Sequence, residues 1–97
     1  MLNYTKHFID IKDVNQVNNL LKHDQLTQGN YVNIFEDRLR KKFGSKFCSV
    51  VSNGTAALFL AIKSLELKKK SKVITTPITF SASVSTSLMN NLEVSYI

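Results

Sequence analysis

The second half of the 97-residue chain alternates short apolar segments with single helical segments, and this alternation limits the possible folds. Residues 47–51, 73–76 and 93–97 are rich in β-branched and aromatic side chains, which favour strands. Residues 55–65 and 81–90 between them are predicted to be helices. Strands that are separated by single helices are expected to pair in parallel, with right-handed crossovers. The sequence therefore predicts an α/β fold in which this half is ordered β-α-β-α-β.

Two amphipathic helices are predicted before this region. The first follows Asp10 or Asp13 as its N-cap and ends near His23, and the second ends at Gly44, a favourable residue just beyond a helix. Apolar residues recur in both at helical spacing, and we expect them to be buried: Ile11, Val14, Val17, Leu20 and Leu21 in the first, and Val32, Phe35, Leu39 and Phe43 in the second. The acids of the second helix precede its bases, which allows ion pairs such as Glu36 with Arg40 and Asp37 with Lys41.

The turn 52–55 joins the first predicted strand of the second half to its helix. Ser52, Asn53 and Thr55 place small polar groups where a helix N-terminus leaves backbone N–H donors unpaired. With the helix dipole, such donors can bind a phosphate, and Gly54 has no Cβ to hinder its approach. An N-cap at Ser52 or Asn53 is an equally simple explanation and, on local chemistry alone, the favoured one.

A second polar loop favours ligand binding over a simple N-cap. Residues 75–80 follow the next predicted strand, so this loop and the turn 52–55 both come after the carboxyl end of a strand. In parallel sheets, ligands bind beyond the carboxyl ends of the strands. Two hydroxyl-rich loops at one edge of the sheet therefore favour a phosphate-bearing ligand over a simple cap.

The composition argues against nucleic-acid binding, metal binding and membrane insertion. The formal net charge of +6 comes largely from a lysine run at residues 68–72, which we interpret as a solvated helix end, and no nucleic-acid partner is expected. The single cysteine, Cys48, is expected to be buried and inert, and with the isolated His7 and His23 it forms no metal-binding pattern. No segment resembles a signal peptide or a membrane span, so a cytoplasmic protein is expected.

Three motifs in order resemble the DegT/DnrJ/StrS family of pyridoxal phosphate (PLP)-dependent sugar aminotransferases of fold type I. Leu26-Thr27-Gln28-Gly29, followed by Phe35-Glu36, is similar to the first block of the family. Residues 52–58 (SNGTAAL) resemble its serine–glycine–threonine–alanine turn. Residues 73–80 (VITTPITF) resemble its next strand and aromatic loop. The resemblance extends from about Tyr4 to Ile97.

The resemblance implies a homodimer that uses PLP, L-glutamate as amino donor and a nucleotide-linked 4-keto sugar as acceptor, in the biosynthesis of pseudaminic acid-type or other surface sugars. By position, Gly54 and Thr55, with Ser52, would bind the cofactor phosphate. Phe80 would lie against the pyridine ring, although ordinary core packing is the alternative for this residue. Tyr4 and Gln28 would lie near the sugar entrance, where a surface tyrosine and a loop amide are equally plausible.

One departure from the family pattern limits what this chain can do alone. The family's cofactor-binding lysine and the acid that pairs with the pyridine nitrogen both match positions beyond Ile97, so no catalytic residue is assigned within the chain. We therefore expect an N-terminal fragment that is inactive by itself, with residues 1–30 as an arm and helix and residues 31–97 as an incomplete PLP-binding large domain. The alternatives are a dehydratase of the same family, in which histidine replaces that lysine, and a non-catalytic phosphate- or nucleotide-binding module.

Overall fold

The computed structural model of the chain describes residues 5–27 and 29–97. These residues belong to two compact units, one ending at Cys48 and the other spanning Ser49–Ile97. The division at residue 30 that the sequence suggested remains a prediction.

The first unit contains the two expected helices, α1 (Ile11–His23) and α2 (Asn30–Phe43). At the start of α1 the Asp10 carboxylate accepts hydrogen bonds from the N–H groups of Lys12 and Asp13, and the Asp13 carboxylate accepts one from Asp10 N–H. This reciprocal capping box explains why the helix begins at Ile11. At the end of α2, Gly44 has φ of 63°, the left-handed conformation that glycine adopts without a steric penalty.

Two ion pairs lie along the exposed face of α2. Asp37 Oδ1 is 2.6 Å from Arg40 Nη2, and Asp37 Oδ2 is 2.6 Å from Lys41 Nζ. Hydrogen bonds from Lys41 and then Arg40 hold the pKa of the Asp37 carboxyl below its ordinary value of 3.8. The predicted pairing of Asp37 with Lys41 is therefore confirmed.

The expectation that the apolar faces of both helices are buried is wrong for this chain. No residue of α1 or α2 is buried. Val14 and Val17 are 51% and 59% exposed on α1, and Phe35 and Phe43 are 51% and 73% exposed on α2. Helical periodicity identifies which face of a helix is apolar, but burial also requires a surface that covers that face.

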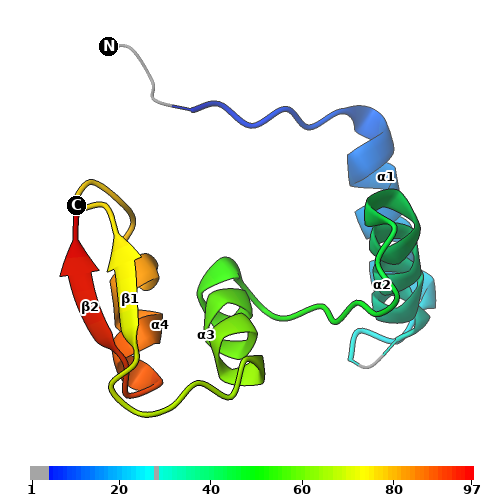
Figure 1. Ribbon diagram of the computed structural model, residues 1–97. Helices are drawn as coiled ribbons and strands as arrows, with labels where there is room; N and C mark the ends of the chain where they lie inside the picture. Colours follow the sequence, from blue (N-terminus) through cyan, green and yellow to red (C-terminus); the bar gives the residue numbers. More distant parts are fainter. Residues whose placement is uncertain (1–4, 28) are drawn as a thin grey trace. The chain divides into compact units, whose positions relative to one another are not determined.

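The second unit is the α/β part of the fold. It consists of α3 (Gly54–Ser64), β1 (Lys72–Thr75), α4 (Ala82–Met89) and β2 (Glu93–Tyr96). The two strands are parallel, with Lys72 opposite Glu93 and Thr75 opposite Tyr96. Helix α4 contacts both strands and α3, so it lies between the sheet and α3 (Figure 1).

The strand expected at residues 47–51 is not formed. Among the residues that the structure describes, the only sheet is the β1–β2 pair, and residues 47–51 are irregular backbone. A strand exists only where a second strand accepts its hydrogen bonds, and residue composition does not supply that partner. The parallel α/β class is confirmed, with two strands in place of three. Cys48 in this segment is half-buried, where the sequence predicted a buried thiol.

The buried core of the second unit is small and centres on α4. Ala82, Thr86 and Ser87 of this helix are buried together with Leu92, which precedes β2. The two hydroxyls are paired within the helix, because Thr86 Oγ1 donates to Ala82 O at 2.6 Å and Ser87 Oγ donates to Ser83 O at 3.4 Å. Leu88 and Met89 of the same helix are exposed.

Candidate functional site

The turn before α3 is an N-cap built by Asn53. Asn53 Oδ1 accepts a hydrogen bond from Ala56 N–H at 2.9 Å, and Asn53 Nδ2 donates to Ser52 Oγ at 3.2 Å. Asn53 has φ of −165° and is extended, so the helix begins directly at Gly54. The cap predicted at Ser52 or Asn53 is thus Asn53, and the Ser52 hydroxyl orients its amide.

The Asn53 cap does not use all of the donors at this helix end. Within residues 5–27 and 29–97, the N–H groups of Gly54 and Thr55 form no hydrogen bond. A Cβ built on Gly54 meets no atom within 4 Å, so the space beside this residue is open. Two free N–H groups at the positive end of a helix, next to open space, suit an anion such as a phosphate.

The second predicted loop follows β1 and leads into α4. Phe80 lies in it and is 75% exposed in this chain. Ser83 makes two hydrogen bonds with the loop: its N–H donates to Phe80 O at 3.0 Å, and its Oγ lies 3.0 Å from Thr79 Oγ1.

Both loops lie at one end of the second unit. In Figure 1 the two strands point upward, and the beginnings of α3 and α4 are at the upper end. This is the edge beyond the carboxyl ends of the strands, where ligands bind in parallel α/β sheets. The residues predicted to bind the cofactor, Ser52, Gly54, Thr55 and Phe80, are therefore at the same edge. Tyr4 and Gln28, predicted near the sugar entrance, are outside the residues that the structure describes.

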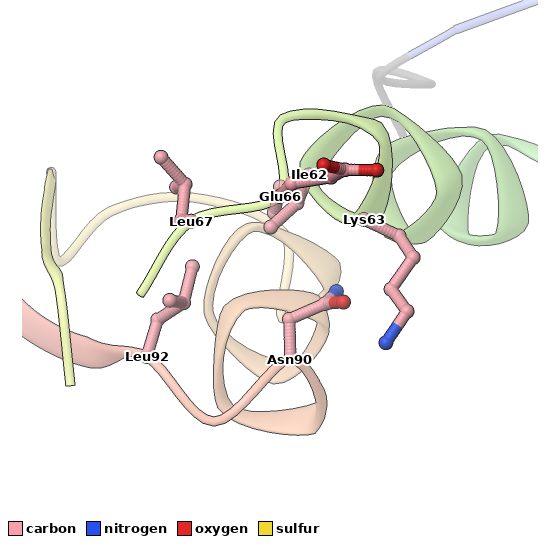
Figure 2. A pocket seen from close by; sticks show the side chains of 6 residues that line it. All are labelled: Ile62, Lys63, Glu66, Leu67, Asn90 and Leu92. Carbon is pink, nitrogen blue, oxygen red and sulfur yellow. The ribbon is translucent and has the colours of Figure 1, made fainter. Parts of the chain in front are cut away.

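A pocket of the second unit lies at the other end of its helices. Its volume is about 340 Å³, and it is lined by Ile62, Lys63, Glu66, Leu67, Asn90 and Leu92. Figure 2 shows Lys63 and Glu66 on one side of this pocket and Leu67 and Leu92 on the other. These residues lie at or just beyond the C-terminal ends of α3 and α4. About 15 Å of helix therefore separates them from Gly54. This pocket is thus separate from the predicted cofactor site.

The first unit has a hollow of about 470 Å³ along α1, lined mainly by Ile9, Val14, Val17 and Leu21. Its one carboxylate, Asp13, is already part of the capping box. In the described ranges, no group of three or more His, Cys, Asp or Glu side chains is arranged to hold a metal. Nor is any helix there long and apolar enough to cross a bilayer.

Comparison with known proteins identifies the family. Residues 8–97, nearly the whole chain, match the DegT/DnrJ/EryC1/StrS aminotransferase family. The chain belongs to this family. It is 38% identical over all of its 97 residues to UDP-4-amino-4,6-dideoxy-N-acetyl-β-L-altrosamine transaminase of Campylobacter jejuni, and it spans 26% of that relative's length.

Solved structures of a dehydratase and of an aminotransferase have the same fold as this chain. GDP-4-keto-6-deoxy-D-mannose-3-dehydratase of Escherichia coli, with bound hydrated PLP, superimposes on the whole chain with a TM-score of 0.86 at 28% identity, and the chain covers 27% of it. An aminotransferase from Psychrobacter cryohalolentis superimposes on 93% of the chain with a TM-score of 0.75 at 27% identity, and 23% of its own length is covered. The cofactor of the family is PLP, and the open turn at Gly54 and the exposed Phe80 ring fit its phosphate and its planar ring.

Two features of the second unit were not expected from the sequence. One is the pairing of Ser83 with Thr79, and the other is the tie between α3 and α4 that Asn90 makes through Phe59 O. A signal for the first was present, because Thr79, Ser83 and Ser87 recur every four residues. In a helical stretch this spacing places side chains on one face, where hydroxyls can bond to each other and to backbone carbonyls.

Proposed function

We propose that the chain is the N-terminal part of an aminotransferase that moves an amino group from L-glutamate to a nucleotide-linked 4-keto sugar. The observation that carries this proposal is the match, over the full 97 residues, to a transaminase that acts on a UDP-linked amino sugar. The proposal includes a product of the pseudaminic acid type or a related surface sugar, as the resemblance of the sequence motifs implies. The chain spans about a quarter of the length of its relatives, so the activity belongs to the whole enzyme, a homodimer in this proposal.

Within that enzyme the two free N–H groups at the start of α3 bind the cofactor phosphate. Gly54 leaves room for a phosphate oxygen, and the hydroxyls of Ser52 and Thr55 are close enough in sequence to add hydrogen bonds. The Phe80 ring stacks on the pyridine ring of PLP. When bound, PLP acts as the electron sink that allows an amino group to be exchanged between two substrates. Tyr4 and Gln28 are assigned to the sugar entrance on the resemblance of the sequence alone.

The residues that do the chemistry come from elsewhere in the enzyme. Every lysine of this chain occupies an exposed position, including Lys63 on α3 and the run Lys68-Lys69-Lys70. The lysine that binds PLP must contact the cofactor, and Lys63 lies near the opposite end of α3 from Gly54. We therefore assign this chain the binding of the cofactor phosphate and ring, and expect no transaminase activity from it alone.

A dehydratase is the second candidate, and a specific observation favours it. The enzyme with the TM-score of 0.86 is a 3-dehydratase of a GDP-linked 4-keto sugar, and it covers the whole chain. Aminotransferases and dehydratases therefore share this N-terminal structure. Product analysis of a complete enzyme separates the two candidates.

The test uses a chimera in which these 97 residues replace the matching segment of the Campylobacter jejuni transaminase. The purified chimera is given PLP, L-glutamate labelled with ¹⁵N in its amino group, and the nucleotide-linked 4-keto sugar that the parent enzyme uses. We expect ¹⁵N in the sugar product, at a rate within about tenfold of the parent, because the cofactor contacts of this segment would be preserved.

A reference rate and a test of folding are needed to interpret the result. The parent enzyme sets the reference rate, and size-exclusion chromatography with circular dichroism establishes that the chimera is folded. A folded chimera that retains no PLP would contradict the assignment of cofactor binding. A folded chimera that retains PLP but transfers no ¹⁵N would contradict the transaminase assignment alone.

A further inference from the structure

In the loop between β1 and α4, hydrogen bonds hold the Phe80 carbonyl and the side chain of the neighbouring Thr79. The Phe80 ring takes no part in these hydrogen bonds. Many apolar side chains of the chain are exposed, so exposure does not set Phe80 apart. What distinguishes Phe80 is its backbone, because Phe80 O accepts a hydrogen bond from Ser83 N–H at 3.0 Å. The preceding residue is held by the same partner, since Thr79 Oγ1 and Ser83 Oγ lie 3.0 Å apart.

Ser83 is itself anchored to the buried part of α4. Its side chain is half-buried, and its carbonyl accepts a hydrogen bond from the fully buried Ser87 Oγ at 3.4 Å. A series of hydroxyls, Thr79, Ser83 and Ser87, thus connects the exposed loop to the core one helical turn at a time. Ser83 thus holds the Phe80 carbonyl and the side chain of the preceding Thr79, while the Phe80 ring is 75% exposed.

We propose that Ser83 is a positioning residue, which with Thr79 clamps the loop so that the Phe80 ring is held ready to stack on the PLP ring. This inference rests on the proposed function for the role of Phe80, and the clamp itself rests on the two hydrogen bonds of Ser83. A ring that is already oriented loses little conformational entropy when it stacks, so clamping the loop increases cofactor affinity without touching the cofactor.

A simple helix cap is the competing explanation, and it makes different predictions. If the Thr79–Ser83 pair only started α4, its loss would lower the stability of the helix and leave cofactor binding unchanged in the folded protein. A clamp, by contrast, affects binding of the pyridine ring and leaves binding of the phosphate unchanged. Pyridoxal, which lacks the phosphate, and inorganic phosphate, which lacks the ring, are therefore the informative probes alongside PLP.

The experiment compares the 97-residue chain with Ser83→Ala, Thr79→Val and Ser83→Thr. Ser81→Ala is the matched control, because Ser81 lies in the same loop and its side chain makes no capping hydrogen bond. The first measurement is ¹⁵N relaxation of the Phe80 and Ser83 amides without ligand. We expect lower order parameters in Ser83→Ala and Thr79→Val, and values like those of the unmodified chain in Ser83→Thr and Ser81→Ala.

The second measurement is the dissociation constant for each probe. We expect Ser83→Ala to bind PLP and pyridoxal about fivefold more weakly, the effect of one lost hydrogen bond, with phosphate binding unchanged and Ser83→Thr restoring affinity. Unchanged order parameters in Ser83→Ala would overturn the clamp, whether or not the cofactor binds. A rigid loop in the unmodified chain with no affinity for PLP would contradict cofactor binding by this chain and leave the clamp supported by relaxation alone.

Discussion

Asn90 Nδ2 donates a hydrogen bond to Phe59 O at 3.3 Å and so ties the end of α4 to the middle of α3, across 31 positions of sequence. The same amide donates to Thr86 O at 2.9 Å, within α4. Helix α3 contacts α4 but neither strand among the described elements, so this amide is a specific polar link between α3 and the rest of the unit.

Removing the Asn90 amide should therefore weaken the attachment of α3 to α4. Asn90→Ala is expected to lower the free energy of unfolding by about 1–2 kcal/mol, because two hydrogen bonds to backbone carbonyls are lost. Urea denaturation followed by circular dichroism measures this. Asn90→Asp keeps the shape and removes the donor, so it should be similarly destabilised, whereas Asn33→Ala on the exposed face of α2 should not be. A stable Asn90→Asp variant would contradict the role of the donor.

The buried hydroxyl of Thr86 gives a second prediction. Thr86 has no exposed surface, and its Oγ1 donates to Ala82 O at 2.6 Å. Thr86→Val preserves the volume and removes the hydroxyl, so it should change the free energy of unfolding by less than about 1.5 kcal/mol. Thr86→Ala also leaves a cavity in the core and should cost more than Thr86→Val. Equal losses in the two variants would show that packing around Thr86 contributes nothing.

The three glycines should respond differently to alanine. A Cβ at Gly29 would lie 2.5 Å from Gln25 O, and Gly44 has φ of +63°, so alanine is strained at both positions. We expect each substitution to cost about 1–2 kcal/mol of stability. At Gly54 the space is open, and alanine favours the helix, so Gly54→Ala should leave stability unchanged or raise it by up to about 1 kcal/mol. Thermal unfolding of the three variants measures the contrast, and a destabilised Gly54→Ala variant would contradict it.

The ion pairs of Asp37 predict a pH dependence of α2. Because contacts with Lys41 and Arg40 lower the pKa of the Asp37 carboxyl in the folded chain, the ionised form is stabilised by folding. That contribution is present above the ordinary value of 3.8 and is lost as the pH falls through the lowered pKa. Titration of the Asp37 carboxyl carbon by NMR should give a pKa below 3.8. A value at or above 3.8 would show that the pairs do not persist in solution, and Asp37→Asn should remove the pH dependence.

The sequence predicted the elements whose signals are local. The Asp10 capping box, the left-handed Gly44 and the Asn53 cap lie within a few residues of the helix ends that they define. The parallel pairing of β1 and β2 followed from the single helix between them. For the candidate site, the chain order alone indicated that the turn 52–55 and the Phe80 loop lie at one edge of the sheet.

The features that the sequence did not predict depend on distant partners. Residues 47–51 have the composition of a strand but pair with no strand among the residues that the structure describes. Phe35 and Phe43 lie on the apolar face of α2, yet they are 51% and 73% exposed. The tie from Asn90 to Phe59 requires knowing how α4 packs on α3. Propensity and periodicity describe a segment, whereas pairing and burial describe what lies next to it.

The most direct test of the account is the affinity of the chimera for PLP and for pyridoxal, with and without Gly54→Ala. The account predicts that Gly54→Ala weakens PLP binding at least about tenfold, because the Cβ occupies the space left for a phosphate oxygen and blocks the free N–H groups of the turn. Pyridoxal, which has no phosphate, should bind equally to both proteins. Equal affinity for PLP with and without the substitution would contradict the claim that this turn holds the cofactor.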